Sequence, residues 1–268
     1  MGDAAQVRTE CLGGRGVIGQ AEVEDGELGD GHVTDDRHVR RRRSGIPSSC
    51  ATLSHSVLSR NSCLNGRVTH FYRPSEGHRL PHDPFNAIVA PRPIGWIGTV
   101  DAEGRRNLAP YSFFNALNYS PPLVGFSSNA WKDTVANCRE TGEFTWNLVT
   151  RTLAEAMNAS STTAEVDEFS AADVEAAESV EISAPRVAAS PATFECRVTQ
   201  IIDLLTADGE SSGSWFTVGE VVGVHLDESL LTDGIVDTAA AEPVLRGGGP
   251  TAYFGISSDQ RFDMRRPG

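Results

Sequence analysis

The strongest constraint on the fold is a series of short apolar runs that begins after Asn86 and continues to residue 226. The runs are rich in β-branched and aromatic residues and are bounded by turn formers, which is typical of β-strands. They are "AIVAPRPIGWIGTV" (87–100), "RRNLAPYSFF" (105–114), "PPLVGFSS" (121–128), "EFTWNLV" (143–149), "ATFECRVTQIIDLL" (192–205) and "SWFTVGEVVGVHL" (214–226). Helical patterns do not alternate regularly with them, so a doubly wound parallel sheet is not indicated. We therefore predict a mainly β fold with short helices, closed as an antiparallel Greek-key barrel.

Helices and turns are predicted between these strands. The stretch "KDTVANCRETG" (132–142) predicts a short helix that ends at Gly142, and "RTLAEAMNAS" (151–160) predicts another. Residues 160–191 are acidic and rich in Ala, so we expect a short helix inside a long excursion. The polar stretches "DAEG" (101–104) and "TADGESSG" (206–213) predict hairpin connections.

The chain divides into two unlike parts near residue 67. Residues 1–66 show no sustained strand or helix period, and the glycine pattern "GRGVIG" (14–19) lacks the strand and helix that a dinucleotide site requires. We expect residues 1–67 to be a disordered or non-native extension, with the true start of translation near Val68. Residues 68–268 are then expected to form the folded domain.

Charge and cysteine usage exclude several classes of protein. The net charge of -13 falls wholly on residues 68–268, because residues 1–67 hold nine Arg and nine Asp or Glu. So acidic a domain repels nucleic acid and anionic membranes, and the block "RHVRRRR" (37–43) is more typical of a solvated tail. Five cysteines without a CxxC pair indicate neither a disulfide framework nor a zinc site. With no long apolar run or signal peptide, we expect a cytoplasmic protein that enters no membrane.

Three polar or glycine-rich clusters stand at the ends of successive strands. They are "RPIG" (Arg92–Gly95), "NLAPYSFFN" (Asn107–Asn115) and "SSNAWKDT" (Ser127–Thr134). The last contains Lys132, the only lysine among 268 residues. At a helix start, its ammonium, the Thr134 hydroxyl and free backbone N–H groups could bind a phosphate. Alternatively, Asp133 or Thr134 is an ordinary N-cap and Lys132 a surface charge.

The other clusters leave similar alternatives open. Ser112 and Asn115 could bond the polar edge of a planar ligand or could satisfy turn backbone. Arg92, between two prolines, could face an anion or lie at an exposed edge. Trp96 and Trp131 could flank an aromatic ligand, although a tryptophan in an apolar strand usually belongs to the core.

In the order in which they occur, these motifs resemble a known family. Residues 85–150 carry RPIGW, a turn, NLAPYSFFN, SPPLV, KDT and TGEFTWN, and this succession resembles the flavin reductase-like family of FMN-binding split-barrel proteins, which includes flavoredoxin-like flavoprotein oxidoreductases. A weaker likeness extends to about residue 226. The resemblance implies a homodimer with FMN near the subunit interface and with NADH or NADPH as hydride donor. The electron acceptor it implies is a flavin, another small molecule or a partner monooxygenase.

The resemblance also implies roles for individual residues. Arg92, Pro93, Ile94 and Gly95 would run along the flavin, partly through their backbone. Ser112 and Asn115 would bond the ring or the ribityl chain, and Lys132, Asp133 and Thr134 would bind the phosphate. No catalytic side chain is implied, because the flavin carries the chemistry. The segment Val244–Pro267 is only loosely similar to the family, which leaves the substrate open.

Competing interpretations remain. Within the same fold, the chain could be a non-catalytic FMN-binding electron carrier. A β-barrel hydrolase would need a Ser or Cys nucleophile with His and Asp, and His225 is the only histidine beyond residue 82. A metal site at His78, His82 and Asp83 is disfavoured because Pro81 prevents helical spacing of the two imidazoles.

Overall fold

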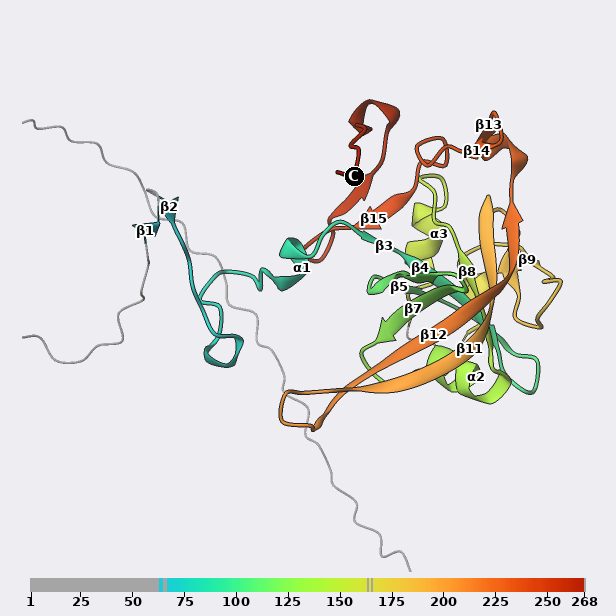
Figure 1. The fold of residues 1–268 in the computed structure, drawn as a ribbon. Coiled ribbons are helices and arrows are strands. Elements are labelled where there is room, and N and C mark those ends of the chain that lie inside the picture. The colour runs from blue at the N-terminus through green and yellow to red at the C-terminus, as the bar shows by residue number, and fades with distance from the viewer. Residues whose placement is uncertain (1–62, 65–66, 163, 165, 268) are drawn as a thin grey trace, which may run out of the picture. The chain divides into compact units, whose positions relative to one another are not determined.

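The computed structural model describes residues 63–64, 67–162, 164 and 166–267 (Figure 1). The glycine pattern at residues 14–19 and the arginine block at residues 37–43 lie outside the described residues. The first described segment is a pair of two-residue strands, β1 (Cys63–Leu64) and β2 (Arg67–Val68).

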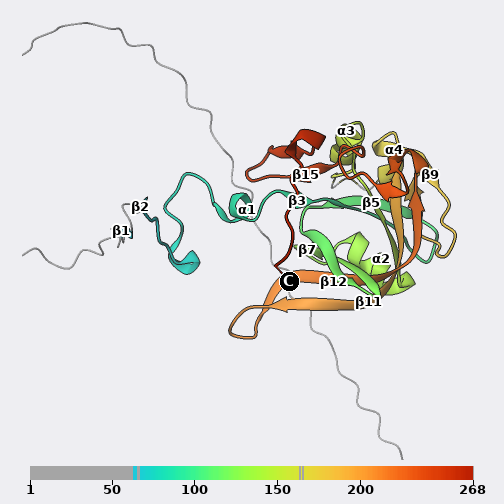
Figure 2. The ribbon, with the colours of Figure 1, turned by 45° about the horizontal axis from the view of Figure 1, so that its top comes forward.

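A seven-stranded antiparallel sheet forms the centre of the fold, which confirms the predicted mainly β class. Its strands, in spatial order, are β5 (Arg106–Tyr111), β4 (Gly95–Val100), β8 (Glu143–Asn147), β11 (Ala192–Leu205), β12 (Ser211–Leu226), β7 (Pro122–Ser128) and β6 (Phe114–Tyr119). Strands β11 and β12 form a long hairpin that extends beyond the rest of the sheet (Figure 2).

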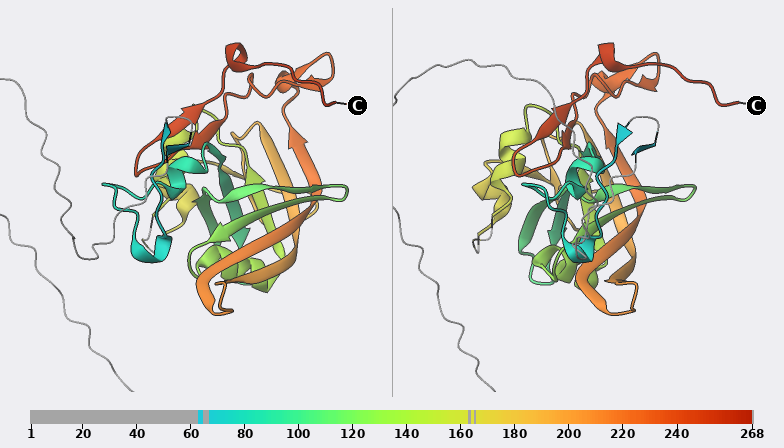
Figure 3. Two further views of the ribbon diagram at one scale, coloured as in Figure 1. Left: turned by 60° about the vertical axis from the view of Figure 1, so that its left-hand side comes forward. Right: turned by 90° about the vertical axis from the view of Figure 1, so that its left-hand side faces the viewer.

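The sheet curves into a split barrel because its two edge strands are consecutive in the chain. Only Ser112 and Phe113 separate β5 at one edge from β6 at the other. The Ser127 N–H donates to the Phe113 carbonyl at 2.8 Å, which holds this junction against β7. Figure 3 shows the resulting barrel. The junction therefore brings the two edges of the sheet together.

Two predicted strands are broken into separate elements in the structure. The run 87–100 was expected to be one strand, but α1 (Phe85–Ile88) precedes the short β3 (Arg92–Pro93), and the long strand starts at Gly95. Pro91 and Pro93 explain this, since proline has no N–H for a strand ladder. The run 105–114 was also expected to be continuous, but it breaks at Ser112 and Phe113, and β6 was not predicted as a separate strand.

The remaining elements lie between the barrel strands or after them. They are η1 (Pro74–Glu76), α2 (Asp133–Thr141), α3 (Ala154–Ala159), α4 (Glu168–Ala171), β9 (Ala176–Ala177), β10 (Arg186–Val187), η2 (Glu228–Leu230), β13 (Leu231–Thr232), β14 (Ile235–Val236), β15 (Val244–Arg246), β16 (Tyr253–Gly255) and η3 (Ser258–Gln260). The predicted helices after residues 132 and 151 and the short helix in the excursion are thus present. β15 pairs with both β16 and β3, so the C-terminal segment is joined to the sequence RPIG.

Helix α2 lies across one end of the barrel (Figures 1 and 3). Its Val135 and Cys138 are buried with Phe126 and Phe144 in the main apolar core. The helix ends as predicted at Gly142, whose φ of 74° is the left-handed conformation that glycine adopts readily. The start of α2 is therefore held at the rim of the barrel. No helix in the described ranges is long and apolar enough to cross a membrane.

Candidate functional site

An open cavity of about 1450 Å³ lies beside the start of α2. Its walls come from β5, the β5–β6 junction, the start of α2, the excursion near residues 160–168 and the tip of the β11–β12 hairpin. Four of the residues predicted for the site line it, namely Ser112, Lys132, Asp133 and Thr134. The other five, which are Arg92, Pro93, Ile94, Gly95 and Asn115, are not among the described residues that line it.

Lys132 stands at the N-cap of α2 with an extended backbone, and its side chain caps none of the helix amides. The backbone N–H groups of Asp133 and Thr134 have no acceptor within the described part of the chain. These amides and the positive end of the helix dipole favour an anion at this place. The predicted helix start is therefore correct, although the N-cap is Lys132 rather than Asp133 or Thr134.

Lys132 is also a cation of the cavity, and no ion pair among the described residues occupies it. Arg105 pairs with Asp101, with Nε and Oδ2 2.5 Å apart, and Arg106 pairs with Asp167. Among the ion pairs formed by described residues, none involves Lys132. An anionic ligand would therefore meet one uncommitted ammonium here without breaking an existing ion pair.

Carboxylates line the same cavity and limit which anions it accepts. They belong to Asp101, Asp133, Glu140, Asp167 and Glu168. Burial raises the pKa of Glu168, and the nearby Asp133 and Asp167 raise it further. Hydrogen bonds from backbone N–H groups, including that of Leu108, lower the pKa but do not cancel the rise. Because the cavity carries more acids than free bases, an anion is favoured only close to Lys132 and the α2 amides.

Thr134 turns its side chain inward. The residue is 1% exposed, and its Oγ1 accepts a hydrogen bond from Asn107 Nδ2 at 2.9 Å. Asn107 Nδ2 also reaches Thr99 Oγ1 at 3.1 Å, and Asn137 Nδ2 donates to the same oxygen at 3.1 Å. Asn107 stands within the NLAPYSFFN cluster, but no role for it follows from the sequence, because nothing local indicates that two strands and a helix meet at its amide.

The two polar residues of the second cluster separate. Ser112 lies at the β5–β6 junction and lines the cavity, whereas Asn115 lies on β6, where its Oδ1 accepts from the Ala116 N–H at 2.8 Å. The chain crosses from one edge of the sheet to the other between them. Their spacing in the sequence therefore does not place them side by side at the cavity.

Arg92 is buried, and backbone carbonyls occupy its guanidinium. Nε donates to Ser112 O at 3.0 Å, Nη1 to Asn86 O at 2.7 Å and to Val89 O, and Nη2 to Gly247 O at 3.3 Å. Burial and the nearby Arg246 lower the pKa of Arg92. The side chain joins α1, the β5–β6 junction and the C-terminal glycine run. The hydrogen bond to Ser112 places the sequence RPIG next to the cavity, although Arg92 itself does not line it.

The rest of the first cluster packs beside the same junction. Ile94 is buried, and its carbonyl accepts from Trp146 Nε1 at 3.0 Å. Gly95 pairs with Tyr111, and a Cβ there would approach the Phe114 side chain to 2.9 Å. Any larger residue at Gly95 would therefore displace Phe114, the first residue of β6.

The two tryptophans considered as ligand platforms have different environments. Trp96 is fully buried, and its Nε1 donates to Ser160 Oγ at 2.9 Å, so it belongs to the core. Trp131 is 40% exposed next to Lys132 and packs edge-on against Trp215, with ring centroids 4.6 Å apart. Only Trp131 is therefore available to a ligand.

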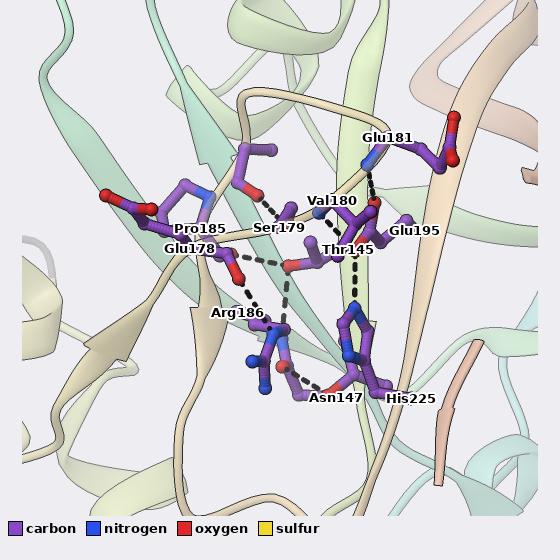
Figure 4. Close-up of polar contacts among 12 residues, drawn as sticks. Thr145, Asn147, Glu178, Ser179, Val180, Glu181, Pro185, Arg186, Glu195 and His225 are labelled. Carbon is purple, nitrogen blue, oxygen red and sulfur yellow. Dashed lines mark hydrogen bonds and ion pairs between the residues drawn. The ribbon is translucent and has the colours of Figure 1, made fainter. Parts of the chain in front are cut away.

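A separate polar network lies under the excursion of residues 160–191 and is drawn in Figure 4. The Glu195 carboxylate is fully buried and accepts from the Val180 N–H at 2.8 Å, the Glu181 N–H at 2.6 Å and His225 Nε2. Burial raises the pKa of Glu195, but these hydrogen bonds outweigh it and hold the pKa below its usual value. Within the described residues, His225 has no Ser or Cys hydrogen-bond partner. Among the described residues, the hydrolase interpretation is therefore supported by a His and an acid but by no hydrogen-bonded nucleophile.

The residues that were weighed and disfavoured as a metal site, His78, His82 and Asp83, are all described by the structure. In the described part of the chain, no three His, Cys, Asp or Glu side chains are grouped so as to hold a metal ion. The His78 ring instead accepts from the Leu80 N–H at 3.0 Å.

Comparison with known proteins identifies similar chains. The family described as Flavin reductase like domain matches residues 89–243. An uncharacterized protein of Deinococcus radiodurans is 36% identical over 199 residues, which are 69% of this chain and 85% of that protein. The crystal structure of nitrilotriacetate monooxygenase component B from Bacillus cereus has a TM-score of 0.66 and 27% identity, covering 74% of this chain and 100% of that one. That of 2-nitrobenzoate 2-nitroreductase from Pseudomonas fluorescens has a TM-score of 0.60 and 30% identity, covering 68% and 88%.

Proposed function

Because this chain belongs to the flavin reductase like domain family, whose proteins have a flavin-related redox role, we propose that it is an FMN-dependent oxidoreductase. In this proposal, electrons pass from NADH or NADPH through bound FMN to an acceptor. The observation that carries the choice of FMN lies on the wall of one cavity. There, among the described residues, the Lys132 ammonium has no ion-pair partner and the amides at the start of α2 have no acceptor. Such a set of donors is suited to a phosphate group.

The residues present fit a phosphate-bearing flavin. Lys132 and the Asp133 and Thr134 amides would hold the phosphate, and Ser112 is a cavity residue whose carbonyl accepts a hydrogen bond from Arg92 of the sequence RPIG. Bound FMN would supply the hydride and electron chemistry, while the protein positions it and tunes its electrostatics. Arg92 then acts through the Ser112 carbonyl that it holds rather than through its own charge. Asn115 lies on the exposed strand β6 and does not line the cavity within a single chain.

An anaerobic titration tests the use of nicotinamide. We expect the flavin absorbance of the holoprotein to bleach rapidly when either NADH or NADPH is added, because the bound flavin accepts hydride. Dithionite serves as a control that the flavin is reducible. Bleaching by dithionite, but by neither nicotinamide, would contradict the reductase and favour the non-catalytic electron carrier.

The electron acceptor in this proposal is a partner monooxygenase or a small molecule. The first option is supported by the likeness to component B of nitrilotriacetate monooxygenase, and the second by the likeness to a 2-nitrobenzoate reductase. Steady-state NADH oxidation with added free flavin or a nitroaromatic acid distinguishes them. A rate that rises with free flavin favours a supply of reduced flavin to a monooxygenase.

We also propose that the protein is a homodimer with FMN near the subunit interface. Strand β6 is an edge strand that exposes Leu117 and Tyr119, at 46% and 95%, and exposed apolar edges of this kind favour association. Phe113 lines the cavity and directly precedes β6, so the same edge borders the cavity. Light scattering of the holoprotein is expected to give twice the chain mass of 28.7 kDa. A monomer at micromolar concentration would contradict the dimer.

A further inference from the structure

The start of α2 needs an anchor if it is to present a phosphate site. The first turn of a helix leaves amide groups unbonded, and an N-cap side chain commonly fixes them in place. Here the N-cap is Lys132, whose side chain makes no cap hydrogen bond. The geometry of this turn must therefore be set by other contacts.

Asn107 supplies such a contact from the barrel wall. It is 8% exposed on β5, and its Nδ2 donates to Thr134 Oγ1 at 2.9 Å and to Thr99 Oγ1 at 3.1 Å. Thr134 is the second residue of α2, and Thr99 belongs to β4. One amide therefore joins the first turn of the helix to two neighbouring strands.

Asn137 makes a related contact one turn further along α2. Its Nδ2 donates to the same Thr99 Oγ1 at 3.1 Å, and it is also 8% exposed. It does not bond Thr134, so it holds the body of the helix rather than its first turn. The two asparagines thus share a residue type, a degree of burial and an acceptor, but differ in their contact with the turn that carries Lys132.

From this network we infer that Asn107 is a positioning residue for the phosphate of the cofactor. This inference rests on the FMN site proposed above. Asn107 acts through the Thr134 hydroxyl, which faces inward and is itself not a phosphate ligand. The bond fixes the direction of the Asp133 and Thr134 amides and of the Lys132 backbone, so that a phosphate meets preorganised donors.

The test compares FMN with riboflavin, which lacks the phosphate. Each flavin is titrated into the full chain freed of cofactor, and binding is measured by fluorescence quenching. In Asn107→Leu, we expect the preference for FMN over riboflavin to fall about fivefold or more, while riboflavin affinity changes little. Thr134→Val removes the same hydrogen bond and should reduce the preference likewise.

Asn137→Leu is the matched control, because it removes an equally buried amide from the same acceptor. It should lower the melting temperature as Asn107→Leu does, yet keep the wild-type preference for FMN. An unchanged preference in Asn107→Leu, or an equal loss in both variants, would overturn the inference. If the wild type itself binds riboflavin as tightly as FMN, the proposed phosphate site fails instead, so the two failures are distinguishable.

Discussion

Replacing Lys132 with alanine is expected to weaken FMN binding by about 10- to 100-fold, with the fold intact. Lys132 is exposed at the N-cap of α2 and is the cavity cation that no described ion pair occupies. A hydrogen bond to a charged partner contributes about 1.5–3 kcal/mol, which corresponds to that change in affinity. The dissociation constant is measured by flavin fluorescence, and circular dichroism checks the fold.

Two controls separate this role from a general effect of charge. Lys132→Arg keeps the cation and should retain most of the affinity, although a planar guanidinium fits a point-like contact less well. Arg139→Ala removes another exposed cation, on α2, which lies at 5.4 Å from the Trp131 ring centroid and not on the cavity wall. Equal flavin affinity in Lys132→Ala and the wild type would return Lys132 to an ordinary surface charge.

Glu195→Leu is expected to destabilise the protein by about 3–5 kcal/mol, because it breaks a buried charged network. Leucine keeps much of the volume but accepts none of the hydrogen bonds that Val180, Glu181 and His225 donate (Figure 4). The Val180 and Glu181 N–H groups and His225 Nε2 then lose the acceptor that they share, which adds to the loss. The free energy of unfolding in urea measures the loss.

The matched control is Glu181→Ala, in the loop whose backbone N–H groups donate to Glu195. Its side chain is exposed, and its backbone N–H still reaches Glu195, so the free energy of unfolding should change by less than about 0.5 kcal/mol. If Glu195→Leu were as stable as this control, the network would contribute nothing to the fold.

Acid should remove the same stabilisation. Burial opposes ionisation of Glu195, but the hydrogen bonds from His225, Val180 and Glu181 hold its pKa below the ordinary value of 4.5. The folded state therefore binds fewer protons at this group than the unfolded state does. Its contribution is fully present above pH 4.5 and is lost as the pH falls through the lowered pKa. The difference in stability between wild type and Glu195→Leu should shrink over that range.

Local patterns predicted most of the long strands of the main sheet and the helix α2. The run 192–205 matches β11 at both ends, and Gly142 ends α2 as expected. These features depend on near neighbours in the sequence, namely β-branched residues in a strand and a glycine after a helix. The break at Ser112 and Phe113 was missed because a change of sheet edge depends on how the whole barrel closes, which no local pattern records.

The sequence by itself determined the mainly β class, the start of α2 and the presence of one lysine there. Only the tertiary structure decided which polar groups share the cavity. Barrel closure placed Ser112 beside it and carried Asn115 onto β6. Burial turned the Arg92 guanidinium toward backbone carbonyls and the Thr134 hydroxyl toward Asn107. The physical reason is that a buried polar group must find a partner inside the fold, and such partners come from segments distant in the sequence.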